Sequence, residues 1–323
     1  MSTKKSADLV LEGGGVKGLG LVGAISALEE HKFTFHRIAG TSAGAIVGSL
    51  TAAGLGSTAM KRMMQQIDYT KFRDKNLLDQ VGLPGELVSL LVKKGVYEGN
   101  YLHTWLRGQL DKLGVRTFGD LRITDDWAQD LPPEQRYKLV VIASDVTRGE
   151  LVRLPWDYRR YGLDPDRQLV ADAVRASMSI PFFYKPAKLR RSWLLDGSYL
   201  SNFPISIFDR TGERDARWPT FGVKLSAKPE VNTAVNPVHS TLGLGRALLA
   251  TMQEAHDRMH LEDPCVVRRT IFVDSASVKT TDFDITRAQQ NKLFQTGHKA
   301  ALQFLSSWSF EAYLRECHDG QMT

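Results

Sequence analysis

Two tight turns near the start of the chain constrain its fold more than any other feature. The first is GGGVKG at residues 13–18, and the second is GTSAG at residues 40–44. Each turn follows a short apolar segment, Ala7 to Leu11 in one case and Arg37 to Gly40 in the other. Each also precedes a stretch rich in small apolar residues. A repeated order of strand, turn and helix is typical of a parallel α/β sheet.

The first turn can stabilise negative charge. Its glycines let backbone N–H groups approach a ligand closely, and the following helix presents the positive end of its dipole there. Gly13, Gly15 and Gly18 also match the G-x-G-x-x-G pattern of dinucleotide-binding proteins. That pattern requires an acidic residue after the next strand, which here ends in Ile38-Ala39-Gly40. The lack of a carboxylate there counts against a nucleotide-binding module, which nevertheless stays as an alternative.

The second turn has the form G-x-S-x-G, with Ser42 between Gly40 and Gly44. A sharp turn between a strand and a helix lifts the serine hydroxyl clear of the backbone, where it can act as a nucleophile. Ser42 could instead cap the following helix. Because both turns fall at the ends of neighbouring strands, where open α/β sheets bind ligands, the pair favours a nucleophile beside an oxyanion hole.

A serine nucleophile needs a base, and Asp196 is the best placed candidate. It follows the apolar residues Trp193 to Leu195 and precedes Gly197, so we expect it at the end of a buried strand. Burial would raise the pKa of its carboxyl and make it a stronger base. A structural Asp-Gly turn and a hydrolase with a histidine triad remain open. None of the eight histidines lies in a comparable loop: His31, His36, His103, His239, His256, His260, His298 and His318.

The rest of the chain continues the α/β pattern. Residues 57–135 read as helical and irregular, and an apolar segment runs from Leu87 to Val92. The other expected strands are Tyr137 to Ser144, Leu151 to Leu154, Thr220 to Leu225 and Thr270 to Val273, and the other expected helices are Gln168 to Ser177, about 239–261 and about 286–306.

Composition indicates a globular cytoplasmic protein. Apolar residues make up 42% of the 323 residues, no apolar stretch is long enough to span a bilayer, and the N-terminus lacks the apolar core of an export signal. Two cysteines, Cys265 and Cys317, cannot make a disulfide framework, and we expect both to be reduced. No arrangement of histidines predicts a metal site.

With these residues together, the chain resembles the bacterial branch of the patatin-like phospholipase family. Residues 13–18 match its Gly-Gly-Gly-x-Arg/Lys-Gly loop, and residues 40–44 match its serine turn. Ala176 to Pro181 matches an Ala-Ser-x-x-x-Pro block, and Asp196-Gly197 precedes Asn202-Phe203-Pro204 as the family requires. Ser198 departs from the usual glycine or alanine. These motifs occur in the expected order between about residues 7 and 205.

The resemblance implies a three-layer α/β/α fold with a mostly parallel sheet. We expect one domain over residues 1–323, with a motif-bearing core at about 7–205 and a C-terminal part at about 206–318 packed on it. It implies ester hydrolysis of phospholipids or lysophospholipids without metal or cofactor. Ser42 would attack the ester, Asp196 would accept its proton and later activate water, and Lys17 would lie near the substrate phosphate. The oxyanion would be held by backbone N–H groups of Gly14, Gly15 and Val16.

The charge balance suits an anionic partner, either nucleic acid or an anionic membrane surface. We expect transient binding to the membrane surface and none to nucleic acid. The net charge is +6 and the pI about 9.2, which suits an anionic partner. A lipid-binding scaffold without catalysis is the remaining alternative. Basic residues that would contact the membrane cluster after Pro181 and beside the apolar segment 87–92: Lys185, Lys188, Arg190, Arg191, Lys93 and Lys94.

Overall fold

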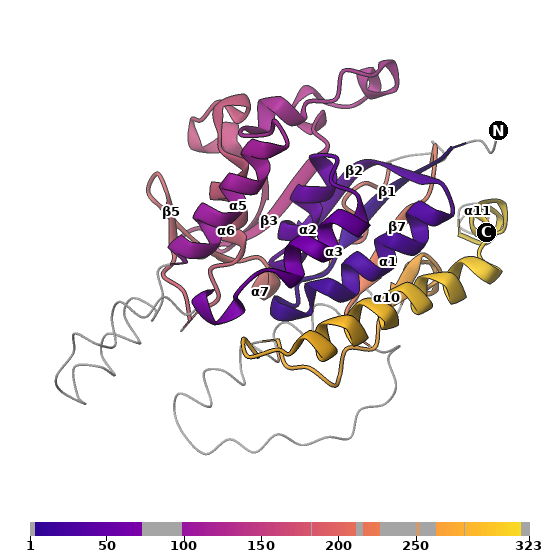
Figure 1. Cartoon of the computed structure of the whole chain (residues 1–323). Helices are drawn as coiled ribbons and strands as arrows, with labels where there is room; N and C mark the ends of the chain where they lie inside the picture. Colours follow the sequence, from indigo (N-terminus) through magenta and orange to yellow (C-terminus); the bar gives the residue numbers. More distant parts are fainter. Residues whose placement is uncertain are drawn as a thin grey trace.

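A computed structural model describes most of the chain (Figure 1). It describes residues 4–72, 99–181, 183–210, 216–226, 251, 263–280 and 282–317. The apolar segment Leu87 to Val92 and the helix expected at about 239–261 lie outside the described residues.

One mixed sheet forms the centre of the described part of the chain. Its order is β5-β6-β3-β2-β1-β7-β8, with β4 paired to β3. The pairs among β3, β2, β1, β7 and β8 are parallel, whereas β4, β5 and β6 run antiparallel to their neighbours. The strands are β1 (Lys5–Leu11), β2 (Phe33–Thr41), β3 (Leu139–Asp145), β4 (Glu150–Leu154), β5 (Ala187–Leu189), β6 (Ser192–Asp196), β7 (Thr220–Lys224) and β8 (Thr270–Phe272).

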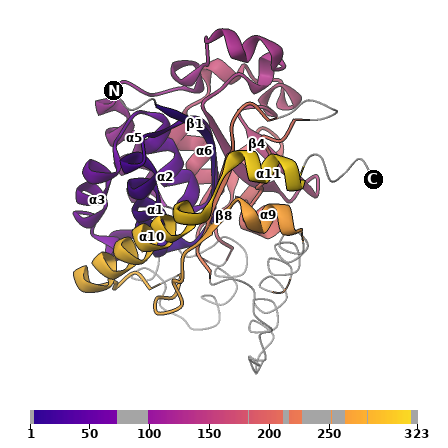
Figure 2. The same ribbon diagram turned by 90° about the vertical axis from the view of Figure 1, so that its right-hand side faces the viewer.

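Helices cover both faces of this sheet. Every residue of β3 is buried, because helices cover both faces of this central strand. Burial on both faces explains why most of the strand is a continuous apolar run. Figure 2 shows α1, α2, α3 and α10 on one side, and α9 and α11 on the other. The three-layer, mostly parallel fold expected from the sequence is thus confirmed. The helices are α1 (Gly18–Glu30), α2 (Ala43–Ala52), α3 (Ser57–Gln65), α5 (Asn100–Lys112), α6 (Val170–Ser177), α7 (Ser198–Ser201), α9 (Pro264–Arg268), α10 (Arg287–Ser307) and α11 (Phe310–Cys317).

The C-terminal helix α10 packs closely against α1. A Cβ atom on Gly23 would overlap the carbonyl oxygen of Phe294, and one on Gly297 would overlap that of Gly20. Glycines therefore let the two backbones touch. At the far end of α1, Nε2 of His298 lies 2.9 Å from a carboxylate oxygen of Glu30. These contacts fix the helix whose N-terminus carries the glycine turn.

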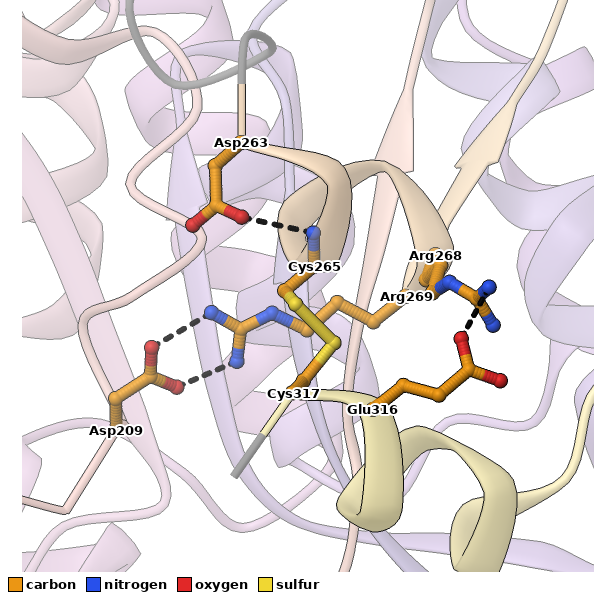
Figure 3. Close-up of a disulfide and its surroundings, with 7 residues drawn as sticks. All are labelled: Asp209, Asp263, Cys265, Arg268, Arg269, Glu316 and Cys317. Atoms are coloured by element: carbon orange, nitrogen blue, oxygen red, sulfur yellow. Dashed lines mark hydrogen bonds and ion pairs between the residues drawn. A yellow bond between two sulfur atoms is a disulfide. The ribbon is translucent and has the colours of Figure 1, made fainter. Parts of the chain in front are cut away.

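The expectation that both cysteines are reduced is wrong. Cys265 and Cys317 form a disulfide, with their Cα atoms 5.7 Å apart. Helices α9 and α11 lie side by side, so that the two side chains meet within disulfide reach. Figure 3 shows the bond beside two ion pairs, Arg269 with Asp209 and Arg268 with Glu316. The presence of only two cysteines argued against a framework of several disulfides, but the sequence could not reveal that these two positions are neighbours in the fold.

Most other expected elements occur with shifted ends. The second strand begins at Phe33 instead of Arg37, and the last long helix ends at Ser307. The short strand β5 and the helix α11 were not expected. Among the described residues, no helix is long and apolar enough to cross a membrane.

Candidate active site

The turn at Ser42 is strained and densely packed. Ser42 has φ 53° and ψ −121°, a conformation that L-residues rarely adopt. Gly40 and Gly44 are required beside it: a Cβ on Gly40 would overlap the carbonyl of Gly44, and one on Gly44 would overlap that of Leu11. The Ser42 amide donates to Oγ of Ser177 at 2.8 Å. The surrounding contacts thus hold the serine in the geometry of a nucleophile elbow.

Asp196 is the last residue of β6, and its side chain is buried. Its Oδ1 accepts a hydrogen bond from the Ser198 amide at 2.9 Å, while Oδ2 has no hydrogen-bond partner among the described residues. Burial raises the pKa of this carboxyl to about 6, and the hydrogen bond from the Ser198 amide and the nearby Ser42 hydroxyl act in the opposite direction. A carboxyl with this pKa is mostly ionised at neutral pH yet remains a usable base.

Strand register brings Ser42 and Asp196 to the same level of the sheet. Thr41 pairs with Ile142 of β3, and Asp196 pairs with the next residue of that strand, Ala143. Because β4 pairs with both Ile142 and Ala143, β2 and β6 share the other edge of β3. Oγ of Ser42 lies 3.4 Å from the sulfur of Met178, a weak acceptor. The hydroxyl is nevertheless close enough to the carboxyl to lower its pKa. Serine and carboxylate are therefore neighbours in a buried environment.

The glycine turn lies directly against the serine turn. A Cβ atom on Gly13 would be 3.1 Å from Cβ of Ser42. Gly15 has φ +55°, and a side chain there would overlap the carbonyl of Thr280. The amides of Gly14 and Gly15 make no hydrogen bond within the described residues, whereas the Val16 amide donates to Thr280 O at 3.1 Å. Two of the three expected oxyanion donors are therefore unoccupied.

A buried ion pair anchors the strand end that carries this turn. Glu12 precedes the turn and pairs with Lys224 of β7, and both side chains are about 5% exposed. Glu12 also accepts from the amide of Leu225 and, at 3.2 Å, from Nδ2 of Asn202. The Gly13 amide in turn donates to Asn202 O at 3.3 Å. Sequence reasoning assigned no role to these residues, although a carboxylate directly before the glycines and a lysine within an apolar strand were visible signals.

Lys17 is half-buried at the start of α1. Burial lowers the pKa of its amino group, and the carboxylates of Glu12 and Asp274 oppose that effect. Its electrostatic neighbours are thus these two carboxylates, and it forms no hydrogen bond or ion pair with Ser42 or Asp196.

The histidines that the structure describes make their hydrogen bonds away from Ser42 and Asp196. His31 contacts Ala27, His36 contacts Ser6, and His103 contacts Asp172, while His298 pairs with Glu30 as noted above. Within the described ranges, no three histidine, cysteine or acidic side chains gather as metal ligands would. His239, His256, His260 and His318 lie outside those ranges.

A narrow apolar hollow opens beside the serine. Its free volume of about 20 Å³ holds about one water molecule, so a longer apolar group enters only if the lining side chains move. Met178, the thioether that contacts Ser42, forms part of its wall. The lining residues are Gly15, Val16, Ala43, Ile46, Met64, Ile67, Tyr69, Trp105, Met178, Ile180, Tyr184, Thr280 and Phe283.

Comparison with known proteins gives consistent matches. The family model described as patatin-like phospholipase matches residues 9–209. An uncharacterised protein of Bacillus subtilis, YqhO, is 36% identical over 307 residues, which are 94% of this chain and 99% of that protein. The lysophospholipase NTE1 of Eremothecium gossypii is 28% identical over 206 residues, which are 62% of this chain. The match spans only 11% of the length of that lysophospholipase.

Two solved structures share the fold. VipD from Legionella pneumophila superposes with a TM-score of 0.53 at 20% identity, covering 95% of this chain and 67% of that one. ExoU, in its complex with SpcU from the type III secretion system of Pseudomonas aeruginosa, gives 0.50 at 18% identity, covering 97% and 53%.

Proposed function

Since this chain belongs to the patatin-like phospholipase family, a family of lipid hydrolases, we propose that it cleaves carboxylic esters of phospholipids or lysophospholipids with Ser42 as nucleophile and Asp196 as base. The observation that carries the proposal is the pairing of a strained serine with a buried carboxyl whose pKa is about 6. The similarity to the lysophospholipase NTE1 of Eremothecium gossypii supports a substrate of this class.

Catalysis proceeds in two halves. Oγ of Ser42 attacks the ester carbonyl while its proton passes to the Asp196 carboxylate, and collapse of the tetrahedral intermediate releases the alcohol, which takes up that proton. The acyl group stays on Ser42. Water then attacks the acyl-enzyme as Asp196 accepts one of its protons, and that proton returns to Oγ when the fatty acid leaves. Asp196 is thus general base and general acid in turn.

Backbone amides of the glycine turn stabilise the oxyanion in both halves. The amides of Gly14 and Gly15 make no other hydrogen bond within the described residues, and the turn lies against Ser42. Donors held in place before the reaction stabilise charge that develops only in the transition state. The Val16 amide would join them only by leaving the carbonyl of Thr280.

The apolar hollow beside Ser42 is the proposed acyl site. Its walls are almost entirely apolar, as a fatty acyl chain requires, and they meet the serine at Met178. Because the hollow holds about one water molecule, substrate binding must displace wall side chains such as Trp105 and Phe283. We therefore expect the site to open when lipid binds.

Fatty acid release from lysophosphatidylcholine and phosphatidylcholine tests the proposal. The parent chain should release fatty acid, and Ser42→Ala, which removes only the nucleophilic oxygen, should not. A matched control is Ser6→Ala, a strand serine that contacts His36 far from the site and should leave the rate unchanged. A parent that binds lipid without releasing fatty acid would instead be an inert scaffold, and equal rates for the parent and Ser42→Ala would exclude Ser42 as nucleophile.

A further inference from the structure

Two neighbouring hairpin tips carry a surface that the catalytic site does not use. We propose that these tips dock the chain on an anionic lipid bilayer. We call the surface the docking patch and define it as Val146, Lys188, Arg190, Arg191 and Trp193. The inference rests on the proposed function in one respect, because a lipid hydrolase meets its substrate at a bilayer.

The apolar part of the patch is exposed. Val146 is 53% exposed and Trp193 is 47% exposed. Among the described residues only one other large apolar side chain, Leu302, reaches the exposed range. Isolated exposed apolar residues need no explanation, but two on adjacent tips form a small apolar point. Tryptophan is the residue that most favours the boundary between lipid headgroups and acyl chains.

Hydrogen bonds hold the two tips together. The Val146 amide donates to the carbonyl of Trp193 at 3.0 Å, and the Trp193 amide donates to Oγ1 of Thr147 at 2.9 Å. The turn after β3 is thus fixed to the start of β6. Arg190 and Arg191 form the turn between β5 and β6, and Arg190 takes a positive φ of 55°. The patch is therefore a built surface with ordered backbone.

Unpaired positive charge surrounds the apolar point. Arg190 and Arg191 are exposed and form no ion pair with any described residue. Lys188 lies opposite Trp193 across the β5–β6 pair, with its Nζ 5.4 Å from the centre of the indole ring.

Among the described residues, two nearby arginines, Arg148 and Arg160, form ion pairs, unlike Arg190 and Arg191. Arg148 lies 3.7 Å from Glu150 and 3.8 Å from Asp145, and Arg160 lies 2.6 Å from Glu150. Their charges are compensated within the protein. Arg190 and Arg191 thus carry the positive charges on the tips that are available to an external anion.

The patch lies past the carboxyl end of β3, at the same end of the sheet as Ser42, which follows the carboxyl end of β2. Asp196 pairs with Ala143, whereas Trp193, three residues before Asp196 in the antiparallel strand β6, lies beyond the pair of Asp145 with Leu194. At about 3.3 Å per residue, the tips extend about 10 Å past the catalytic level. A bilayer that contacts the tips would therefore face the end of the sheet that carries Ser42.

Vesicle binding by the Ser42→Ala chain tests the patch without hydrolysis. Vesicles contain phosphatidylcholine either alone or with phosphatidylserine, in about 0.1 M salt, where the Debye length is about 10 Å. Neutralising both tip arginines, Arg190→Gln with Arg191→Gln, should weaken partition onto the anionic vesicles about 30-fold, at about 5-fold for each charge. The matched control, Lys32→Gln with Lys138→Gln, removes the same charge from exposed positions at the amino ends of β2 and β3, the ends away from the tips. It should change partition less than about 2-fold, since charges farther than a Debye length from the surface are screened.

A second variant tests the apolar point. Trp193→Ala should weaken binding to both kinds of vesicle by a similar factor. Equal loss in the arginine pair and in the lysine control would overturn the patch, because net charge alone would then explain binding. Binding to duplex DNA that depends on the arginines, without binding to vesicles, would overturn it too.

The patch and the catalytic proposal can fail separately. With Ser42 restored, the tip variants should hydrolyse a soluble short-chain ester at the parental rate. A parent without esterase activity whose vesicle binding still depends on the patch would refute the catalytic assignment alone. Parental vesicle binding by the tip variants, with intact esterase activity, would refute the patch alone.

Discussion

Replacing Asp196 by asparagine should abolish hydrolysis and stabilise the fold at the same time. Asparagine keeps the size of the side chain and can still accept from the Ser198 amide through its oxygen. It cannot accept the proton of Ser42. Loss of a general base costs roughly 10²–10⁴ in rate, so we expect kcat/KM for a soluble ester to fall by at least that amount.

The gain in stability follows from the buried carboxyl. Folding raises the pKa of Asp196 from 3.8 to about 6, so the unfolded chain ionises first as the pH rises. The native state therefore loses stability between these two values, and the loss stays constant above pH 6. A shift of this size corresponds to about 3 kcal/mol. Asp196→Asn removes that cost, so the free energy of unfolding should rise by up to about 3 kcal/mol at pH 8 and change little at pH 4.

The same pKa sets the pH dependence of the parent enzyme. With a pKa of about 6, the carboxylate is roughly nine-tenths ionised at pH 7 and one-tenth ionised at pH 5. The parental kcat/KM should therefore fall about tenfold between pH 7 and pH 5.

Urea unfolding at pH 4 and pH 8 measures the free energy of unfolding of the parent and of Asp196→Asn. Initial rates on a soluble ester from pH 5 to pH 8 measure kcat/KM. Either of two results would refute the reasoning. One is an Asp196→Asn chain that keeps near-parental kcat/KM, and the other is a parental kcat/KM that stays flat between pH 5 and pH 7.

Three further changes test the surroundings of the site. Gly15→Ala should reduce kcat roughly 10²–10³-fold, because a methyl group there would overlap Thr280 and displace the turn; a folded variant with the parental rate on a soluble ester would contradict this. Glu12→Gln should lower the free energy of unfolding by about 3–5 kcal/mol, since it takes the carboxylate from buried Lys224. Urea unfolding should show partial recovery when Lys224→Met is added, and no recovery would argue against the ion pair. Cys265→Ser opens a disulfide that closes 52 residues and should cost about 2–4 kcal/mol in urea unfolding; an unchanged midpoint would show that the bond does not form in solution.

Local patterns in the sequence were enough to predict the fold and the turns that carry Ser42 and Asp196. Strand, tight turn and helix are short-range patterns that can be recognised within a few residues of sequence. Gly40, for example, is required because its neighbour in space is the Gly44 carbonyl. The level of both side chains has a different cause from the rule for neighbouring parallel strands, because β6 runs antiparallel and its carboxyl end meets that of β2 along β3.

Contacts between distant segments could not be predicted in this way. The pairing of Glu12 with Lys224 depends on β1 and β7 being neighbours, which no pattern within either strand reveals. The disulfide depends in the same way on the packing of α9 beside α11. The bond from the Val16 amide to Thr280 joins residues far apart in the chain, and it reduces the set of available oxyanion donors.

Charge and exposure also needed the structure. The cluster of basic residues after Pro181 was visible in the sequence, but its members are not equivalent. Lys185 is half-buried, whereas Arg190 and Arg191 form an exposed turn. Trp193 was read only as part of an apolar strand, yet it is half-exposed because alternate residues of the edge hairpin face outward.

Covalent labelling with a fluorophosphonate probe, followed by mass spectrometry of the labelled peptide, tests the central claim most directly. The probe reacts with an activated serine whatever the natural substrate. The account predicts one labelled residue, Ser42, and labelling that becomes far slower in Asp196→Asn but stays at the parental rate when His298 is replaced by alanine. Labelling at a different serine, or an undiminished rate in Asp196→Asn, would contradict it.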